Sequence, residues 1–341
     1  MKFTKLAIAA AAGLAFAGQA HAQSSMLDQI KERGQLICGI NTGLVGFAFT
    51  DEAGNWQGFD VALCKAVAAA IFGDPSKVQY TSLTGKTRFT ALASGEVDML
   101  SRNTTWTLSR DADLGLTFTG VNYYDGQGFM VPKALGVSSA SELDGATVCI
   151  QTGTTTELNL ADYFRANNMD YEPVPIETNA EAQQRYLAEA CDVYTTDASG
   201  LAATRASFDN PDDHVILPEI ISKEPLGPAV REGDEPWGDV VRWVLNALII
   251  AEEKGVTAEN VEEMAAAEDI NPDVARLLGV EGEMGSMLGL PNEWAISAIK
   301  AVGNYGEVFD EYLGPDTAVG LERGLNALYT DGGIMYAPPI R

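Results

Sequence analysis

Short apolar runs alternate with amphipathic segments over residues 36–94, and glycine-rich turns separate them. Residues 36–40 and 78–83 have the length and composition of buried strands. One helix is expected from about Asp60, which would be its N-cap, to residue 71. A second helix is expected over residues 86–94, and Gly95 would end it. Parallel strands need a crossover such as a helix between them. Successive strand–helix units therefore predict an α/β fold with a parallel sheet core.

The same alternation leads into a polar stretch. A short buried strand is expected over residues 97–100, and the small polar side chains of Asn103 and Thr105 follow it. Thr107 can cap a new helical turn, which places Arg110 close to free backbone N–H groups. Helix N-termini favour anions, and a guanidinium can bind a carboxylate through two parallel hydrogen bonds. The stretch is a candidate anion site, and the alternative is a surface loop with an exposed arginine.

The first 22 residues have the composition of a cleaved export signal. Lys2 and Lys5 give a basic start, an apolar run covers residues 6–17, and a small-x-small motif ends at Ala22. No apolar run reaches the ~18 residues that suggest a membrane-spanning helix. The sequence therefore predicts a signal peptide over residues 1–22 and an exported, soluble mature protein.

Charge narrows the range of partners. The formal net charge is −26, and loss of Lys2 and Lys5 with the signal peptide would take it to −28. This excess argues against nucleic acid and against anionic membrane surfaces as partners. It does not show that the ligand is a cation, since acidic surfaces usually serve solubility. The remaining ~320 residues, in a chain with 46% hydrophobic content, suit two lobes with ample core.

The four cysteines are Cys38, Cys64, Cys149 and Cys191. An even count in an exported chain favours disulfides, although four cysteines allow three pairings. The local pairings, Cys38 with Cys64 and Cys149 with Cys191, would each stabilise the fold by roughly 3–4 kcal/mol in the chain-entropy model. The sequence has no CxxC pair, and His214 is the one histidine after the signal peptide, so a zinc site has little support.

A second α/β block begins near Pro132. A strand over residues 147–151 leads through a hydroxyl-rich turn into a helix, where backbone N–H groups suit an anion or a polar ligand. The alternative is an ordinary cap, in which Thr154 pairs with Glu157. A later strand ends at Asp197, which is either the cap of the next helix or, opposite an arginine, the counter-ion of an ammonium group.

Two extended segments, near residues 129–131 and 216–221, indicate that the chain leaves the first lobe and later returns to it. A hinged two-lobed molecule needs such crossings. The final ~85 residues are expected to be helical, and a stripe of aromatic and small residues recurs there at three- and four-residue spacing. Such a stripe predicts core packing rather than a cofactor face. Its members are Trp294, Ala298, Ala301, Tyr305, Phe309 and Tyr312.

Five motifs carry a resemblance to a known family. They read GFDV at 58–61, ASGEVD at 93–98, SRNTTWTLSR at 101–110, QTGTTTE at 151–157 and DVYTTD at 192–197. With these motifs in this order, the mature chain up to about residue 251 resembles the periplasmic solute-binding proteins of polar amino-acid ABC transporters. The motifs and the tail look like the general L-amino-acid or glutamate/glutamine/aspartate/asparagine branch.

The resemblance implies a type II periplasmic binding protein fold, with a mixed sheet flanked by helices in each lobe, a two-strand hinge and a helical C-terminal extension. Lobe one would comprise residues 23–128 and 225–341, with the extension over 251–341, and lobe two residues 129–224. Closure of the lobes would capture a free L-amino acid in the periplasm and deliver it to the membrane permease. The implied protein is a monomer with no cofactor, no metal and no nucleic-acid partner.

The resemblance also implies a ligand site. Arg110 matches the arginine that binds the ligand α-carboxylate, and Asn103 and Thr105 match its neighbours. Thr155 matches a hydroxyl of lobe two that reaches the same carboxylate, and Asp197 matches the aspartate that binds the α-ammonium. Physical chemistry agrees, because a buried zwitterion leaves two charges that must both be paired.

The side chain of the ligand is expected to meet two further residues. Arg88 resembles an arginine that acidic-amino-acid-binding relatives use for the side-chain carboxylate, and the alternative is a surface pair with an acid such as Glu96. Many relatives place an aromatic ring where this chain has Leu44, so Phe47 is the expected apolar wall. Arg102 is expected to be structural, because strand alternation turns it away from its two neighbours at the site.

Other functions share the implied fold. Periplasmic dehydratases and wall-cleaving transglycosylases need a glutamic acid with a raised pKa aimed into the cleft. Among the matched motifs only Glu157 could serve, and it is expected to lie outside the site. A ligand-sensing module for a chemoreceptor or a kinase is the second alternative, because it would close in the same way.

Overall fold

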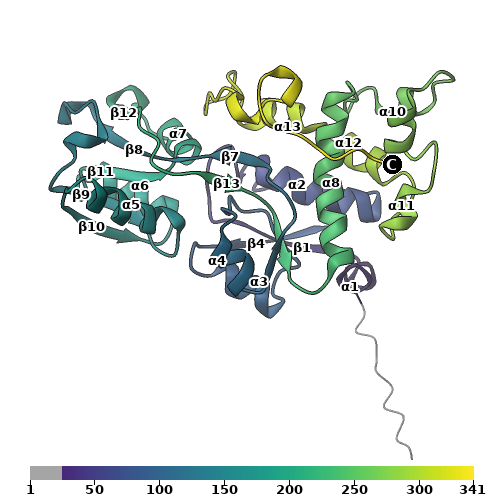
Figure 1. The fold of residues 1–341 in the computed structure, drawn as a ribbon, viewed down its shortest axis with the longest axis horizontal. Coiled ribbons are helices and arrows are strands. Elements are labelled where there is room, and N and C mark those ends of the chain that lie inside the picture. The colour runs from purple at the N-terminus through teal and green to yellow at the C-terminus, as the bar shows by residue number, and fades with distance from the viewer. Residues whose placement is uncertain (1–24) are drawn as a thin grey trace, which may run out of the picture.

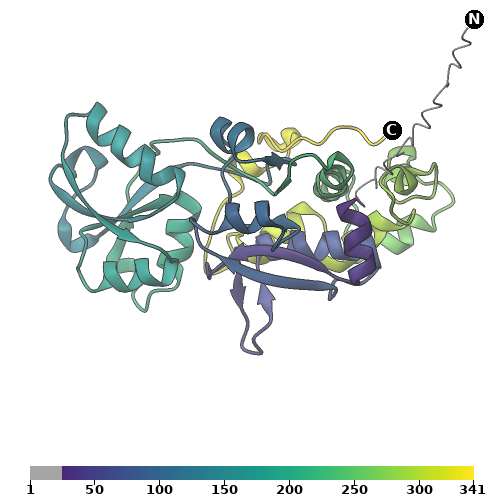
Figure 2. The same ribbon diagram turned by 90° about the horizontal axis from the view of Figure 1, so that it is seen from below.

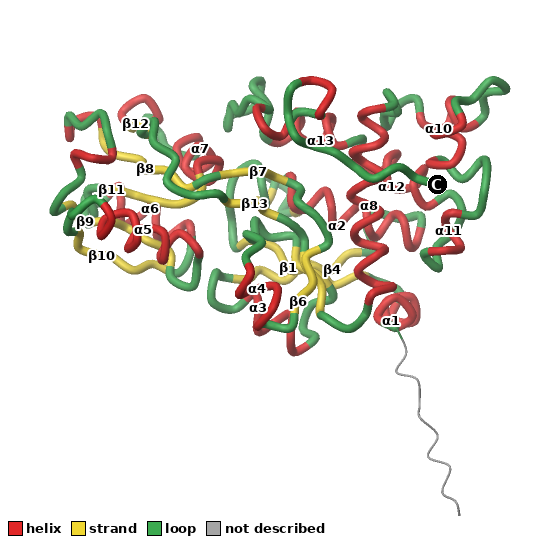
Figure 3. The backbone as a smooth tube through the Cα atoms, viewed as in Figure 1, coloured by secondary structure: helices red, strands yellow, loops and turns green. Residues whose placement is uncertain are grey.

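The computed structural model describes residues 25–341, so the signal peptide expected over residues 1–22 lies outside the described part of the chain. Two bodies lie side by side, and strands and loops join them (Figures 1 and 3). Each body contains a five-stranded sheet with helices packed on it, which confirms the predicted two-lobed α/β fold. No helix within residues 25–341 is long and apolar enough to cross a membrane.

The first sheet belongs to lobe one and has the order β4-β1-β5-β14-β6. Its strands are β4 (Val78–Leu83), β1 (Leu36–Asn41), β5 (Met99–Leu100), β14 (Ala229–Arg231) and β6 (Leu116–Phe118). β1 pairs in parallel with β4 and β5, as the strand–helix alternation predicted. β14 arrives from the returning chain and pairs antiparallel with β5 and β6, which makes the sheet mixed.

The second sheet belongs to lobe two and has the order β10-β9-β11-β8-β12. Its strands are β10 (Tyr171–Ile176), β9 (Ala146–Gln151), β11 (Val193–Asp197), β8 (Gln127–Pro132) and β12 (His214–Ile216). β9 pairs in parallel with β10 and β11, whereas β8 is antiparallel to β11. The two sheets therefore share one plan: three parallel strands are followed by one antiparallel strand, β14 or β8, and then by an edge strand that pairs antiparallel with it.

Two short antiparallel strands connect the bodies. They are β7 (Tyr123–Asp125) and β13 (Glu224–Leu226), and Asp125 lies opposite Glu224. The lobe boundaries expected after residues 128 and 224 fall inside β8 and β13 respectively. The reason is that each crossing strand runs on into the next segment without a turn, so sequence composition does not mark the change of body.

Helices of lobe one enclose the first sheet. α2 (Phe59–Phe72) is buried along most of its length because the sheet, α8 (Glu235–Glu253) and α12 (Trp294–Val302) pack around it. A separate hairpin of β2 (Phe49–Thr50) and β3 (Trp56–Gln57) precedes α2. The helices are α1 (Met26–Arg33), α2 (Phe59–Phe72), α3 (Arg88–Ser94), α4 (Leu108–Asp113) and α8 (Glu235–Glu253).

Lobe two carries the helices α5 (Thr155–Ala166), α6 (Asn179–Leu187) and α7 (Ala198–Ala206) around its sheet. Threonines cap both α5 and α6: the side-chain oxygen of Thr154 accepts the backbone N–H of Glu157 in α5, and that of Thr178 accepts the backbone N–H of Glu181 in α6. These caps hold the helix starts at the carboxyl ends of the strands, where ligands collect in open α/β sheets.

The C-terminal helices are α9 (Val261–Ala265), α10 (Pro272–Leu277), α11 (Met284–Met287), α12 (Trp294–Val302) and α13 (Tyr305–Tyr312). Of these helices, α12 and α13 pack on both α2 and α8, and α10 packs on α8. α10 and α11 lie at the end of the molecule away from lobe two, whereas α13 lies nearer its middle (Figures 1 and 2). Trp294, Tyr305 and Phe309 are buried, which confirms that the aromatic stripe is core.

The chain after α13 reaches back to the hinge. The side chain of Asn326 accepts the N–H of Tyr124 at 2.7 Å and donates to its carbonyl at 3.1 Å. The hydroxyl of Tyr305 donates to the carbonyl of Asn122 at 2.8 Å. The extension therefore binds the backbone of β7, which also pairs with β13.

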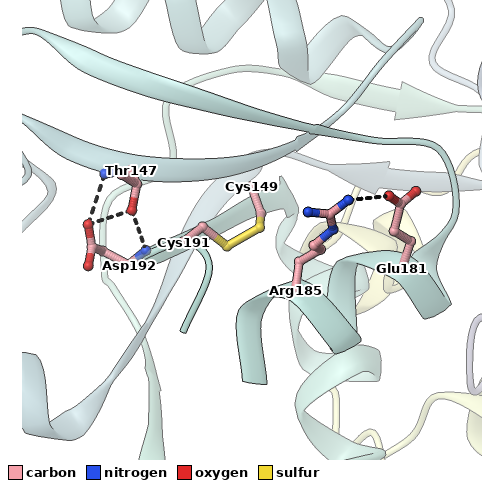
Figure 4. The surroundings of a disulfide bond; sticks show 6 residues. All are labelled: Thr147, Cys149, Glu181, Arg185, Cys191 and Asp192. Carbon is pink, nitrogen blue, oxygen red and sulfur yellow. Dashed lines mark hydrogen bonds and ion pairs between the residues drawn. A yellow bond between two sulfur atoms is a disulfide. The ribbon is translucent and has the colours of Figure 1, made fainter. Parts of the chain in front are cut away.

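Two disulfides join Cys38 to Cys64 and Cys149 to Cys191, which are the predicted local pairs. The first links β1 to α2 inside lobe one. The second links β9 to the residues before β11 inside lobe two (Figure 4). Beside it, the Asp192 carboxylate accepts the N–H and hydroxyl protons of Thr147. The disulfide and these hydrogen bonds therefore both join β9 to the residues just before β11.

Each disulfide should stabilise its own lobe. Replacing Cys149 and Cys191 by alanine is expected to lower the free energy of unfolding of lobe two by ~4 kcal/mol, since the bridge closes a loop of 42 residues. Denaturation with a separate probe in each lobe measures this, and peptide mapping without reduction checks the pairing. A bridge between the lobes would contradict the structure.

Candidate functional site

A cavity of about 20 Å³ lies between the two bodies, where the ends of strands from both sheets face each other. Side chains from both bodies line it, so no single lobe forms the site. Lobe one contributes Arg88, Arg102, Asn103 and Thr105, and lobe two contributes Gln151, Thr154, Thr155, Thr156, Thr196 and Asp197. Five of the seven predicted ligand residues, Arg88, Asn103, Thr105, Thr155 and Asp197, therefore lie together.

The loop after β5 is held by a buried acid. α2 begins at Phe59 after Gly58, so the expected N-cap role of Asp60 is wrong. The Asp60 carboxylate instead accepts the backbone N–H of Asn103 at 2.9 Å. Asn103 has a positive φ of 30°, a region that asparagine tolerates better than most residues, and its side chain accepts from Asn41 at 2.9 Å. Asp60 thus fixes the conformation that presents Asn103 to the cavity.

Arg110 lies beside the cavity lining on α4. Thr107 caps this helix by accepting the N–H of Arg110 at 3.3 Å, as predicted. The Arg110 side chain is buried and donates to the carbonyl of Thr105 at 2.9 Å, while its guanidinium lies 5.0 Å from the ring centre of Phe89. Burial lowers the pKa of Arg110, and the carboxylates of Glu224 and Asp197 oppose that shift. The alternative, a surface loop with an exposed arginine, is therefore excluded.

Two more arginines from lobe one line the cavity. Arg88 is buried and donates to the carbonyl of Asn103 at 3.3 Å and to the hydroxyl of Thr104 at 3.2 Å, so the alternative of a surface pair is wrong. Arg102 donates to the carbonyl of Leu83 at 2.9 Å and also lines the cavity, which strand alternation did not predict. One buried nitrogen of each, Nε of Arg88 and Nη2 of Arg102, has no hydrogen-bond partner among residues 25–341.

The first turn of α5 faces these arginines. Thr154 caps it by accepting the N–H of Glu157, and the Glu157 carboxylate accepts the N–H of Gly153 at 3.0 Å. Thr154 therefore caps α5 as the alternative predicted, but the Glu157 carboxylate bonds the N–H of Gly153 instead of completing a capping box with Thr154. The cap does not exclude the site, because Thr155 and Thr156 still line the cavity from the same turn.

Asp197 ends β11 and is buried at the cavity. Its side chain forms no capping hydrogen bond to α7, so the alternative role as a plain helix cap is excluded. Burial raises the pKa of Asp197 well above its usual value, with further contributions from Asp125 and Glu224, while Arg88 and Arg110 oppose the shift. A cationic group placed here would stabilise the ionised form.

Phe47 does not reach this cavity. Its ring packs edge-on against Phe59 and Tyr123, with centroids 6.1 and 5.7 Å away, inside the core of lobe one. Phe47 is therefore a core residue of lobe one and does not form the predicted apolar wall of this cavity. The physical reason is that the turn at Gly46 directs the ring inward, where burial of a full aromatic side chain is most favourable.

Sequence reasoning missed Glu224, which β13 places between the lobes. The buried carboxylate accepts the hydroxyl proton of Thr105 at 2.5 Å and that of Thr155 at 2.8 Å. An acid followed by Pro225 in an extended crossing was the available signal. No local motif identifies Glu224, because its partners Thr155 and Thr105 lie 69 and 119 residues away in the sequence.

The lobes also touch directly on either side of the cavity. Asn179 of lobe two donates to the Asn41 side chain at 3.2 Å and to the carbonyl of Gly43 at 3.0 Å. Lys86 of lobe one forms an ion pair of 3.1 Å with Glu177. Together with the contact of 3.3 Å between the hydroxyls of Thr105 and Thr155, these bonds describe a closed arrangement.

Asp60, the buried acid that binds the N–H of Asn103, should make the free energy of unfolding depend on pH. Burial raises the pKa of Asp60 to about 7, above its usual 3.8, despite the N–H of Asn103 and the charge of Arg102. The folded protein therefore holds this proton to higher pH than the unfolded chain does. Relative to Asp60→Asn, the free energy of unfolding of the wild type should fall by ~1.4 kcal/mol per pH unit between pH 4 and 7. Denaturation across this range measures it, and parallel curves would contradict the assignment.

Comparisons with known proteins identify the family of the chain. The sequence model of the bacterial extracellular solute-binding proteins, family 3, matches residues 36–281. The glutamate/glutamine/aspartate/asparagine-binding protein BztA of Rhodobacter capsulatus is 66% identical, covering 94% of each chain. The general L-amino acid-binding periplasmic protein AapJ of Rhizobium johnstonii is 56% identical over the full length of both.

Solved structures share the fold as well. A periplasmic binding protein of an ABC transporter from Brucella ovis, with glutathione bound, has a TM-score of 0.91 at 56% identity, covering 94% of this chain and all of that one. The cysteine-binding protein of Campylobacter jejuni has a TM-score of 0.60 at 26% identity, covering 73% of this chain and 98% of its own. On the family match and these identities, the chain belongs to family 3 of the bacterial extracellular solute-binding proteins.

Proposed function

We propose that this protein is the substrate-binding subunit of an amino-acid ABC transporter and captures a free L-amino acid between its lobes. The observation that carries the proposal is the charge arrangement at the closed cavity. Buried arginines come from lobe one, and the buried carboxylate of Asp197 comes from lobe two. A zwitterion is the ligand class that pairs both signs at once.

The pairing sets the expected roles of the charged residues. Among the described residues the guanidinium of Arg110 forms one hydrogen bond, to the carbonyl of Thr105, so it retains donors for an α-carboxylate. Asp197 is the partner for the α-ammonium. Burying either ligand charge without a partner would cost several kcal/mol, so a ligand that lacks one of them should bind poorly.

Closure links binding to transport. Lobe one is assigned to the chain before β8 and from β13 onward, lobe two to the segment between them, and β7 and β13 form the hinge. Because the ligand's partners come from both lobes, the ligand stabilises the closed arrangement over an open one. A membrane permease can then recognise the closed form. The names of the relatives, which are ABC transporter-binding proteins, support a role in transport.

The relatives also support the location and the class of function. The AapJ relative is named a periplasmic protein, and the signal-like first 22 residues of this chain fit export. The carboxylate of Glu157 is engaged with a backbone N–H, and Glu224 accepts hydrogen bonds at both oxygens. Neither is placed as a free proton donor, which favours binding over catalysis.

Arg88 is the proposed determinant of the ligand side chain. It is buried and lines the cavity, and its Nε atom has no hydrogen-bond partner in the described part of the chain. A guanidinium donates to a carboxylate or to an amide oxygen, so glutamate, aspartate, glutamine and asparagine should all bind. The printed name of the BztA relative covers the same four amino acids.

A screen of the mature protein against the twenty amino acids tests this function. A ligand at 100 times its Kd should raise the free energy of unfolding by ~2.7 kcal/mol, and no stabilisation by any amino acid would refute the proposal. In the same assay Arg110→Ala is expected to weaken every bound amino acid by ~2–5 kcal/mol, because it leaves a buried carboxylate unpaired.

The matched control is Arg165→Ala, an exposed arginine on α5 that pairs with Asp162. This variant should keep wild-type affinity. Asp197→Asn should weaken all amino acids as Arg110→Ala does, through the ammonium. Selective loss for one ligand in either variant would mean that the residue reads a side chain instead.

The role of Arg88 gives a separate prediction. Arg88→Met should cost acidic ligands ~1–2 kcal/mol more than amide ligands, since the lost hydrogen bond is charge-assisted for the carboxylate alone. Calorimetry with L-glutamate and L-glutamine on both proteins measures the difference. Equal losses, or no loss for either ligand, would remove Arg88 from side-chain recognition.

A further inference from the structure

Glu224 occupies a position that no ligand-binding role yet explains. It begins β13, is buried, and faces both lobes from the hinge. Oε2 accepts from the hydroxyls of Thr105 in lobe one and Thr155 in lobe two, at 2.5 and 2.8 Å. Oε1 accepts from Asn159 on α5 at 2.7 Å and from Ser222 in the hinge segment at 2.8 Å.

The four donors fill the acceptor capacity of the carboxylate in a geometry that one lobe cannot supply. Both carboxylate oxygens of an ionised glutamate accept and neither donates. The set is complete when lobe one, lobe two and the hinge are together, as they are in the closed arrangement. Glu224 is therefore arranged to act on binding, and it does so through its neighbours.

The hydroxyl protons of Thr105 and Thr155 decide what these side chains can offer a ligand. A threonine hydroxyl has one proton to donate and two lone pairs to accept with. If Thr105 and Thr155 both give their protons to Glu224, each can offer only lone pairs to a ligand. Such hydroxyls accept from an ammonium group and cannot donate to a carboxylate.

We propose that Glu224 is a positioning residue that orients the hydroxyls of Thr105 and Thr155 as acceptors for the ligand's ammonium group. This inference rests on the proposed function. It changes the expected part of Thr155, whose hydroxyl joins Asp197 at the ammonium and leaves the α-carboxylate to Arg110 and the N–H groups of the first turn of α5. Glu224 itself does not touch the ligand.

Glu224→Gln tests the direction of these bonds. Its oxygen can still accept from Asn159, which turns the amide N–H groups toward the two threonines and makes their hydroxyls donors. L-Glutamate should bind ~10–100-fold more weakly, as loss of hydrogen bonds to a charged group implies. Glutarate, which is glutamate without the ammonium, should bind more tightly than it does to the wild type.

A second arm separates positioning from general structure. In a Thr105→Val, Thr155→Val background no hydroxyl remains to orient, so adding Glu224→Gln should change the Kd for L-glutamate less than threefold. Ser222→Ala is the matched control, because it removes a donor from Oε1 alone and should keep the wild-type ratio of glutarate to glutamate affinity.

The outcomes discriminate between the proposals. Equal losses in both backgrounds, or no gain in glutarate affinity, would overturn the positioning role while amino-acid binding by the wild type stands. Failure of the wild type to bind any amino acid in the same calorimeter would overturn the proposed function and this role together. If Glu224→Gln does not fold, Thr155→Val alone serves: it should weaken L-glutamate and leave glutarate affinity unchanged, and parallel losses would overturn the role.

Discussion

Burial of charge at the contact between the two lobes is the constraint on which the rest of the structure depends. Arg88, Arg102 and Arg110 are all buried, and burial lowers the pKa of each. On the other side burial raises the pKa of Asp197. Each guanidinium is held by carbonyl oxygens of neighbouring backbone rather than by a carboxylate. The charges are thus fixed in place and still able to pair with a ligand.

The fold maintains this arrangement through short connections at the strand ends. Asp60 fixes the loop after β5 through the N–H of Asn103, and Thr107 and Thr154 cap α4 and α5, which begin close to the cavity. A disulfide inside each lobe adds rigidity to the sheets without crossing the hinge. Rigid lobes and an unbridged hinge are what a ligand-driven closure requires, because the ligand's free energy then acts on one motion.

The hinge is more than a pair of linkers. Asp125 and Glu224 lie opposite each other on β7 and β13, and burial raises the pKa of Asp125 to about 6. On the outer edge of β7, Asn326 of the C-terminal extension bonds both backbone groups of Tyr124. The extension and the hinge are therefore one packed unit, so the helices after residue 251 contribute to the place where the lobes meet.

The sequence by itself determined the alternation of strands and helices, both local disulfide pairs and five residues of the cavity lining. These features depend on local pattern or on motifs whose spacing is fixed by one strand end or one helix start. Tertiary structure alone decided three further points. Asp60 and Phe47 were assigned wrongly because the sequence does not show which way a side chain turns at a tight loop. Strand alternation predicted that Arg102 would point away from the cavity, but it lines the cavity. The reason is that β5 ends at Leu100, so side chains in the loop after it no longer alternate between two faces. Glu224 was missed because its partners lie far away in the chain, and only the closing of two lobes brings them to one carboxylate.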